Sequence, residues 1–191
     1  MSDCLRIAEL VDRIGRIARG AQFSSGLNPA QWEALRFIAR ANRYSRSPGA
    51  LACYLGATRG TVSQTLITLE SKGYITRTKC GDDRRAVTID LTDAGREMIA
   101  NDPLCLVLRA ADGLGCEAQS QLADGLEGLV RAVQEAKDMP EFGPCQSCAY
   151  FQPDADGKIE GGSCHCALTD EPILCEETSK ICVEFKSQAK V

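Results

Sequence analysis

Six cysteines and the only histidine of the chain are concentrated in its C-terminal quarter. The series opens with Cys145-x2-Cys148, within "GPCQSCAYF", and its remaining members are Cys164, His165, Cys166, Cys175 and Cys182. Two thiolates on one tight turn can reach the same ion, so the Cys-x2-Cys spacing is a chelating geometry. We therefore interpret residues 139–191 as a cysteine-rich, metal-binding extension.

Two occupants fit such a set of ligands. Zinc takes four Cys or His ligands tetrahedrally, and a closed four-thiolate site would fold a segment that has few core residues. An iron–sulfur cluster also takes four cysteines and tolerates irregular spacing between them. Zinc ribbons usually carry two Cys-x2-Cys pairs, whereas this segment has one. The spacing therefore favours a cluster, with zinc as the alternative.

A simpler interpretation is that these thiols are ordinary buried residues or form disulfides. The chain has no stretch of about 18 apolar residues and no secretory signal, so we expect a cytoplasmic protein, in which thiols stay reduced. The other five cysteines stand at scattered positions, where inert core residues are the usual outcome: Cys4, Cys53, Cys80, Cys105 and Cys116. Cys80 borders an expected hairpin tip and is the one of these five that could be accessible.

The charge of the chain is unevenly distributed. The whole sequence carries a net charge of −4, but the segment from Arg36 to Arg85 holds ten Lys or Arg residues against three acids. That segment is therefore +7 and the remainder −11. Such asymmetry is typical of a basic binding face on an acidic body.

The periodicity of apolar residues predicts the elements that carry this basic face. Helices are expected over residues 3–19, 28–42, 47–56, 57–73, 92–100 and 116–137, and residues 74–80 and 86–91 alternate like the strands of a hairpin. Asn28, Ser47, Thr58 and Thr92 are the expected N-caps. The third and fourth helices meet at a tight turn around Gly56, as in a helix-turn-helix.

Helix, tight turn, helix and a basic-tipped hairpin describe a winged helix-turn-helix. The stretches "LGATRGTVSQTLITLESKGYITR" and "DRRAVTIDLTDAG" resemble the MarR family of bacterial transcriptional regulators over residues 5–137. The wing signature of that family corresponds here to Asp83, Arg85, Leu91, Thr92 and Gly95. The resemblance implies a homodimer with interlocked terminal helices that docks on a palindromic operator, and an Asp83 that braces Arg85.

A recognition helix of about four turns enters the major groove with its N-terminal half nearest the bases. Gln64 can pair with adenine, and hydroxyls at the helix N-terminus can bind phosphate. Wing arginines can reach the minor groove. The expected DNA-binding residues are Thr58, Arg59, Thr61, Ser63, Gln64, Thr65, Lys72, Arg77, Arg84 and Arg85.

The extension is similar to cysteine-rich tails on some regulators of this family, with matching cysteines at 145, 148, 166 and 182. These four are the expected metal ligands, and Cys164, His165 and Cys175 are alternates. The expected fold is mainly α with a small β-hairpin wing (α+β). Its first domain is residues 1–138, with the helix-turn-helix at 48–73, the wing at 74–91 and dimer helices at 3–19 and 93–137. Residues 139–191 form the extension.

The sequence thus predicts a dimeric transcriptional regulator that binds double-stranded DNA and senses redox or iron state through an iron–sulfur cluster in its tail. Loss of the cluster would act through the dimer helices. The alternative is the same regulator with a structural zinc and a small-molecule effector. An enzyme is not expected, because no Ser-His-Asp set, phosphate loop or Gly-x-Gly-x-x-Gly is present.

Overall fold

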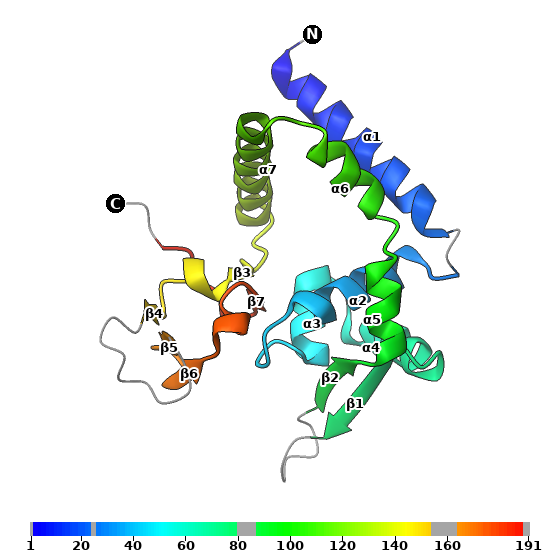
Figure 1. Cartoon of the computed structure of the whole chain (residues 1–191), viewed down its shortest axis with the longest axis vertical. Helices are drawn as coiled ribbons and strands as arrows, with labels where there is room; N and C mark the ends of the chain where they lie inside the picture. Colours follow the sequence, from blue (N-terminus) through cyan, green and yellow to red (C-terminus); the bar gives the residue numbers. More distant parts are fainter. Residues whose placement is uncertain (1, 24–25, 80–86, 154–163, 189–191) are drawn as a thin grey trace.

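The computed structural model describes residues 2–23, 26–79, 87–153 and 164–188 (Figure 1). Seven α-helices lie in the described part of the chain: α1 (Asp3–Phe23), α2 (Pro29–Arg40), α3 (Pro48–Leu55), α4 (Arg59–Ser71), α5 (Asp93–Ala100), α6 (Cys105–Asp112) and α7 (Cys116–Ala136). The antiparallel hairpin of β1 (Ile75–Lys79) and β2 (Val87–Leu91) follows α4. The described elements are therefore mainly helical with a small β component, as the sequence predicted.

The predicted caps hold the helix-turn-helix in place. Asn28 and Gln31 form a reciprocal capping box at α2, and Ser47 caps α3 by accepting a hydrogen bond from Ala50 N. Gly56 ends α3 in the left-handed region at φ 58°, which a glycine adopts without steric cost. Thr58 then caps α4 only two residues later. The tight turn between α3 and α4 is thus fixed by local signals that the sequence shows.

The core of this lobe lies where α2, α3 and α4 meet the hairpin. Trp32, Leu35 and Ile38 on α2 are at most 3% exposed. Val62, Leu66 and Leu69 on α4 are at most 1% exposed and belong to the same cluster. Both sets repeat at helical spacing and were the predicted buried stripes.

The structure explains why the wing signature requires a threonine at 92 and a glycine at 95. Thr92 donates its hydroxyl to Gly73 O at 2.6 Å and caps α5 by accepting from Gly95 N. A Cβ on Gly95 would lie 2.0 Å from Tyr74 O, so only glycine fits there. The end of the hairpin is therefore locked onto the end of α4. Residues 80–86, which include Cys80, Asp83, Arg84 and Arg85, lie outside the described residues.

The long helices leave apolar faces uncovered in a single chain. Figure 1 shows α7 standing apart from the lobe of α2 to α5, and none of its residues is buried. The exposed apolar residues of α1 and α7 follow the helical periodicity of the sequence: Leu5, Ile7, Leu10, Val11, Ile14, Ile17, Leu122, Leu126, Leu129, Val130 and Val133.

Arg36 joins α2 to the turn before α6 through two hydrogen bonds to Asp102, at 2.5 and 2.6 Å.

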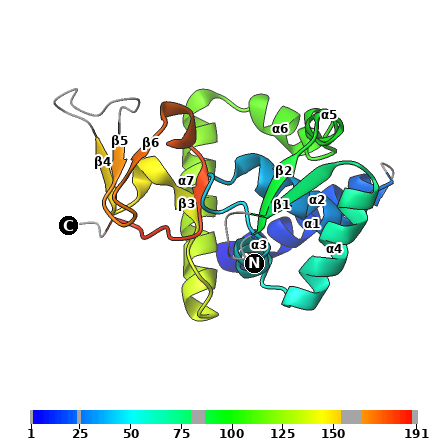
Figure 2. The ribbon, with the colours of Figure 1, turned by 90° about the horizontal axis from the view of Figure 1, so that it is seen from below.

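The C-terminal tail folds into short strands and turns. The strands are β3 (Gly143–Pro144), β4 (Phe151–Pro153), β5 (Cys164–Cys166), β6 (Glu171–Ile173) and β7 (Ile181–Cys182), and the 3-10 turns are η1 (Cys145–Ser147) and η2 (Cys175–Glu177). β3 pairs with β7, and β4, β5 and β6 form an antiparallel sheet. Figure 2 shows this sheet at one end of the molecule and the lobe of α2 to α4 at the other. Ile181 and Phe142 of the tail pack on the core of the lobe.

Within the described residues no helix is both long and apolar enough to cross a membrane.

Candidate nucleic-acid interface and cysteine pocket

The outer face of α4 presents the predicted polar side chains. Thr58, Arg59, Thr61, Ser63 and Gln64 are all exposed. Val62 and Leu66, on the opposite face, are buried in the lobe. The buried stripe therefore orients the helix so that its N-terminal half offers guanidinium, amide and hydroxyl groups to solvent.

Hydroxyl groups on α4 also serve the helix itself. Thr58 Oγ1 accepts a hydrogen bond from Thr61 N at 3.2 Å and lies 2.9 Å from Thr61 Oγ1. The hydroxyl of Thr65 is half-exposed and donates to Thr61 O. The positive end of the helix dipole lies at Thr58, so this end favours an anion such as a phosphate.

Two predicted basic residues already have partners within the chain. Lys72 Nζ donates to Gly26 O at 2.8 Å. Arg77 on β1 donates two hydrogen bonds to Glu70 on α4, and these lower the pKa of the Glu70 carboxyl. The Arg77–Glu70 pair ties the wing to the recognition helix, which positions one against the other. The other two predicted arginines, Arg84 and Arg85, lie outside the described residues.

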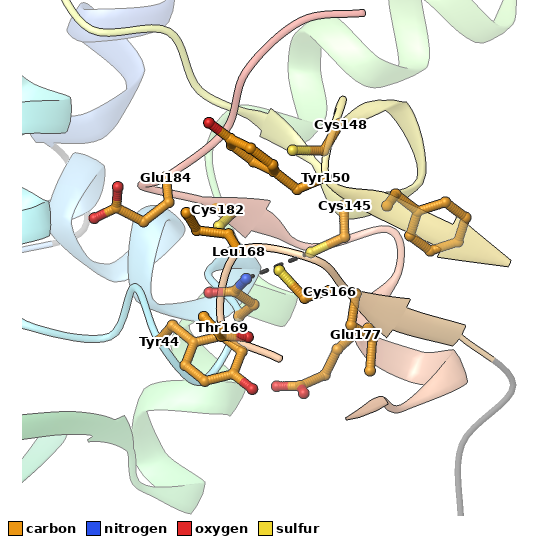
Figure 3. Close-up of a pocket in the computed structure, with 13 residues that line it drawn as sticks. Tyr44, Cys145, Cys148, Tyr150, Cys166, Leu168, Thr169, Glu177, Cys182 and Glu184 are labelled. Atoms are coloured by element: carbon orange, nitrogen blue, oxygen red, sulfur yellow. Dashed lines mark hydrogen bonds between the residues drawn. The ribbon is translucent and has the colours of Figure 1, made fainter. Parts of the chain in front are cut away.

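Four cysteines line a single small cavity in the tail (Figure 3). They are Cys145 of η1, Cys148 just after it, Cys166 of β5 and Cys182 of β7. The cavity encloses about 30 Å³. These are the four expected ligands, brought together from three separate segments of the tail. The tail has few apolar residues of its own, so tight turns and short strand pairs, rather than a hydrophobic core, hold the four cysteines together.

The cavity wall also includes residues that the sequence did not suggest. Asn42 and Tyr44, from the connection between α2 and α3, line it beside Phe151 and Ile173. Asn42 Nδ2 lies 3.4 Å from Cys145 Sγ and donates to it. No local pattern in the sequence marks Asn42, because its neighbour Cys145 is 103 residues away.

Cys145 and Cys182 share a proton across the cavity. The hydrogen bond to Cys182, together with burial, raises the pKa of the Cys145 thiol. The same bond, donated by Cys145, lowers the pKa of Cys182 to about 6. The two sulfurs are therefore linked through one proton. A metal that binds both sulfurs must release that proton.

The three alternate ligands lie away from the cavity wall. Cys164 is buried beside Cys145 and Ile173, and Cys175 is exposed at η2. His165 is on β5 between the two cysteines, and its Nε2 lies 3.3 Å from an oxygen of Asp170. In the part of the chain that the structure describes, no group of three or more His, Cys, Asp or Glu side chains is arranged to hold a metal ion. The four cysteines share a cavity without forming a finished coordination shell.

The interpretation of the scattered cysteines as core residues was wrong for the four that the structure describes, and Cys80 lies outside the described residues. Cys4, Cys53 and Cys116 are exposed, and Cys105 is half-buried. Cys4 lies in the first turn of α1, Cys116 is the first residue of α7, and Cys53 is exposed on α3. The helical pattern predicted these helices but not which of their faces a single chain covers.

The tail contacts the lobe through the α2–α3 connection. Ala41 forms a bridge with Ile181, and Arg43 pairs with Glu177 and Glu171 of the tail. Tyr44 donates its hydroxyl to Glu171. The tail is therefore anchored to the helix-turn-helix rather than attached only by its linker.

The lobe resembles known transcription regulators in sequence. Residues 25–86 match the model of the MarR family. The chain is 30% identical over 76 residues to the transcriptional repressor MprA of Escherichia coli, a match that covers 40% of this chain and 43% of the repressor. The matched part thus spans less than half the length of that relative.

The solved structures that resemble the chain cover more of it. A complex of MepR from Staphylococcus aureus with DNA aligns at a TM-score of 0.54 and 19% identity, over 70% of this chain and 97% of MepR. CouR from Rhodococcus jostii RHA1, bound to p-coumaroyl-CoA, aligns at a TM-score of 0.51 and 23% identity, over 64% of this chain and 90% of CouR.

MarR-family transcription regulators bind DNA and are not enzymes, which agrees with the absence of a catalytic motif from the sequence. The alignments with MepR and CouR cover 70% and 64% of the chain, and the family match ends at residue 86, before the cysteine tail. Residues 25–86 carry the sequence pattern of the MarR family, and together with the fold of the lobe this supports a winged-helix regulator of MarR type.

Proposed function

We propose that the chain is a homodimeric MarR-type transcriptional regulator that binds a palindromic operator through α4 and the wing. The exposed polar face of α4, held outward by a buried stripe at Val62, Leu66 and Leu69, is the observation that carries this proposal. The DNA-bound state of MepR, which has the same fold, supports it. Such a protein acts where the chromosome is, in the cytoplasm.

Selection from random duplexes tests DNA recognition without knowledge of the operator. The full chain should enrich sequences with two inverted half-sites about one helical turn apart, because a two-fold dimer places two recognition helices at that spacing. The Gln64→Ala variant should enrich a motif with less information in each half-site. Enrichment of no motif by the folded dimer would contradict sequence-specific binding.

We infer that the dimer forms through α1, α6 and α7. Most large apolar residues of these helices are about 40 to 70% exposed in the single chain, among them Leu108 at 69% and Val130 at 55%. Apolar patches of this extent on a monomer are typical of protein interfaces. Light scattering should give twice the mass of one chain, and Leu126→Asp should shift the mass toward the monomer. A monomeric wild type would refute this interface.

We propose that the tail binds an iron–sulfur cluster through Cys145, Cys148, Cys166 and Cys182, and that the regulator senses redox or iron state. The convergence of these four thiols on one buried cavity supports the ligand set. A cluster takes four cysteines at irregular spacing, which fits one Cys-x2-Cys pair followed by separate cysteines at 166 and 182.

The alternative is a structural zinc with a small-molecule effector as the signal. The small size of the cavity, about 30 Å³, favours a single ion. CouR, which has a similar fold, was solved with p-coumaroyl-CoA bound, and this alternative likewise requires a small-molecule effector.

Elemental analysis of protein purified without oxygen separates the two. Iron with an equal amount of acid-labile sulfide, and absorption in the visible range, support a cluster. About one zinc per chain in a colourless protein supports the alternative. Cys148→Ser should lower the metal content in either case. Cys175→Ser, at a tail cysteine that does not line the cavity, is the matched control and should leave it unchanged.

A further inference from the structure

A buried polar network joins the cysteine cavity to the helix-turn-helix. Asn42 is 2% exposed and Ser45 is fully buried. Asn42 Nδ2 donates to Cys145 Sγ at 3.4 Å, and Asn42 Oδ1 accepts from Ser45 N at 3.0 Å and Ser45 Oγ at 2.7 Å. Ser45 Oγ in turn accepts from Val183 N at 2.8 Å. Because each group has a partner, the network fixes the position of Asn42 against the sulfur.

The backbone beside this network is also held by the tail. The amide of Asn42 donates to Ile181 O at 2.9 Å, and the amide of Arg43 donates to Glu177 Oε1 at 2.9 Å. The guanidinium of Arg43 donates to Pro172 O at 2.7 Å. Residues of β6, η2 and β7 in the tail therefore hydrogen-bond to two consecutive residues of the α2–α3 connection.

The same connection contacts the DNA-binding elements at its other end. Arg46 O accepts from Ile89 N at 2.8 Å, and the Arg46 guanidinium pairs with Asp90, so the connection is tied to β2 of the wing. Ser47 follows at once and caps α3 through Ala50 N. Residues 41–47 thus lie between the cavity, the wing and the first helix of the helix-turn-helix.

We propose that Asn42 is a positioning residue that stabilises the sulfur centre by donating a hydrogen bond to Cys145, and that residues 41–47 transmit occupancy of the cavity to the wing and α3. This inference rests on the proposed metal centre. A thiolate bound to a metal is a stronger acceptor than a thiol, and donors of this kind tune metal affinity. Filling the cavity therefore tightens the contact that holds the connection in place.

This route differs from the expected one through the dimer helices. Asn42, Arg43 and Ser45 belong to the lobe that carries α4, so the tail can bias the geometry of the DNA-binding elements directly. Loss of the centre removes the negative sulfur that Asn42 faces and loosens the hydrogen bonds on both sides of residues 41–47. The wing and α3 are then positioned less firmly.

Asn42→Asp tests the positioning role. The carboxylate keeps an acceptor for Ser45, but it cannot donate to Cys145 and adds a negative charge beside it. The anaerobically purified full chain is challenged with EDTA, and the iron or zinc that remains is measured over time. Asn42→Asp should weaken metal retention about 10- to 100-fold, the usual effect of losing such a donor. Gln146→Glu, the same chemical change at an exposed position next to Cys145, should retain metal like the wild type. Wild-type retention by Asn42→Asp would overturn the role.

Hydrogen exchange on the wild-type protein tests the transmission, even if Asn42→Asp fails to fold. Removal of the metal should speed exchange in peptides covering residues 41–47 and 87–91 by at least about tenfold, because the amides of Asn42, Ser45 and Ile89 lose firmly held acceptors. Peptides from α1 and α7 serve as the comparison. A change confined to residues 143–188, or to α1 and α7, would overturn the transmission while leaving the metal centre intact. A purified chain with neither iron nor zinc would overturn both the centre and this inference.

Discussion

Truncation of Ile181 tests whether the tail and the winged-helix lobe unfold as one unit. Ile181 is 6% exposed and packs on the core that contains Trp32 and Leu51, although it lies in the last strand of the tail. Replacement of a buried isoleucine by alanine removes apolar burial and leaves a cavity, at a cost of about 2–5 kcal/mol. We take about 3 kcal/mol for Ile181→Ala, because a short strand can relax in part.

That cost gives a measurable shift in thermal unfolding. For a chain of this size, 1 kcal/mol lowers Tm by about 2–4 °C, so Ile181→Ala should lower it by about 6–12 °C. Ile181→Val should lower Tm by about a third as much. The assay is calorimetry or circular dichroism of the protein as purified, followed at the helical signal of the lobe.

Leu174 of the tail provides the control for Ile181. Leu174→Ala removes a tail leucine that is 39% exposed, and its cost should stay below about 1 kcal/mol. If Ile181→Ala leaves the helical transition unchanged and affects only a small separate step, the tail is an independent appendage. The proposed route through residues 41–47 would then have no energetic basis.

Three further changes have expected outcomes. Gln64→Ala should weaken binding to a selected operator by about 1–3 kcal/mol and relax specificity at one base position, measured by fluorescence anisotropy with all four bases at that position. Asp102→Asn should cost about 2 kcal/mol at pH 7, because Arg36 loses a charged partner in a half-buried site. Burial raises the pKa of Asp102, but hydrogen bonds from Arg36 and Leu104 N outweigh it, so the net pKa is lowered. The ion pair therefore adds to the free energy of unfolding above the ordinary carboxyl pKa of about 3.9, and this contribution is lost as the pH falls through the pKa of the folded state. Chemical denaturation should show a smaller difference in the free energy of unfolding between the wild type and Asp102→Asn at pH 3 than at pH 7. Gly95→Ala should yield an unfolded or strongly destabilised chain, because the added Cβ meets Tyr74 O at 2.0 Å; normal expression and Tm would show that the hairpin can move.

The sequence predicted the features that depend on local signals. The caps at Asn28, Ser47 and Thr58 depend on side chains three residues from the groups that they satisfy, and the structure has all three. The buried stripes of α2 and α4 follow helical periodicity in the same way. The wing strands occur where alternation predicted them, although the arginines of the tip lie outside the described residues.

The features that the sequence could not predict depend on contacts across long separations. Asn42 gains its role from a sulfur 103 residues away, and nothing around it in the chain indicates that neighbour. Cys164 and Cys166 lie two residues apart on β5, so the sequence alone does not distinguish them as ligands. Only the folding of the tail brings Cys166 to the cavity wall. Cys4 and Cys116 lie on α1 and α7, whose surfaces the described single chain leaves largely exposed, so helical periodicity alone did not predict the exposure of these thiols. The division at residue 138 and the metal ligands remain predictions.

If residues 41–47 couple the cysteine cavity to the helix-turn-helix, DNA binding should depend on whether the cavity holds its metal. The most direct test is the affinity of the full chain for its selected operator duplex, measured by anisotropy before and after removal of the bound metal at one salt concentration. We expect specific binding by the loaded dimer and a change in affinity of at least about fivefold when the metal is removed, the lower end of typical coupling between sites. Equal affinities in the two states, with the metal loss verified by elemental analysis, would contradict it.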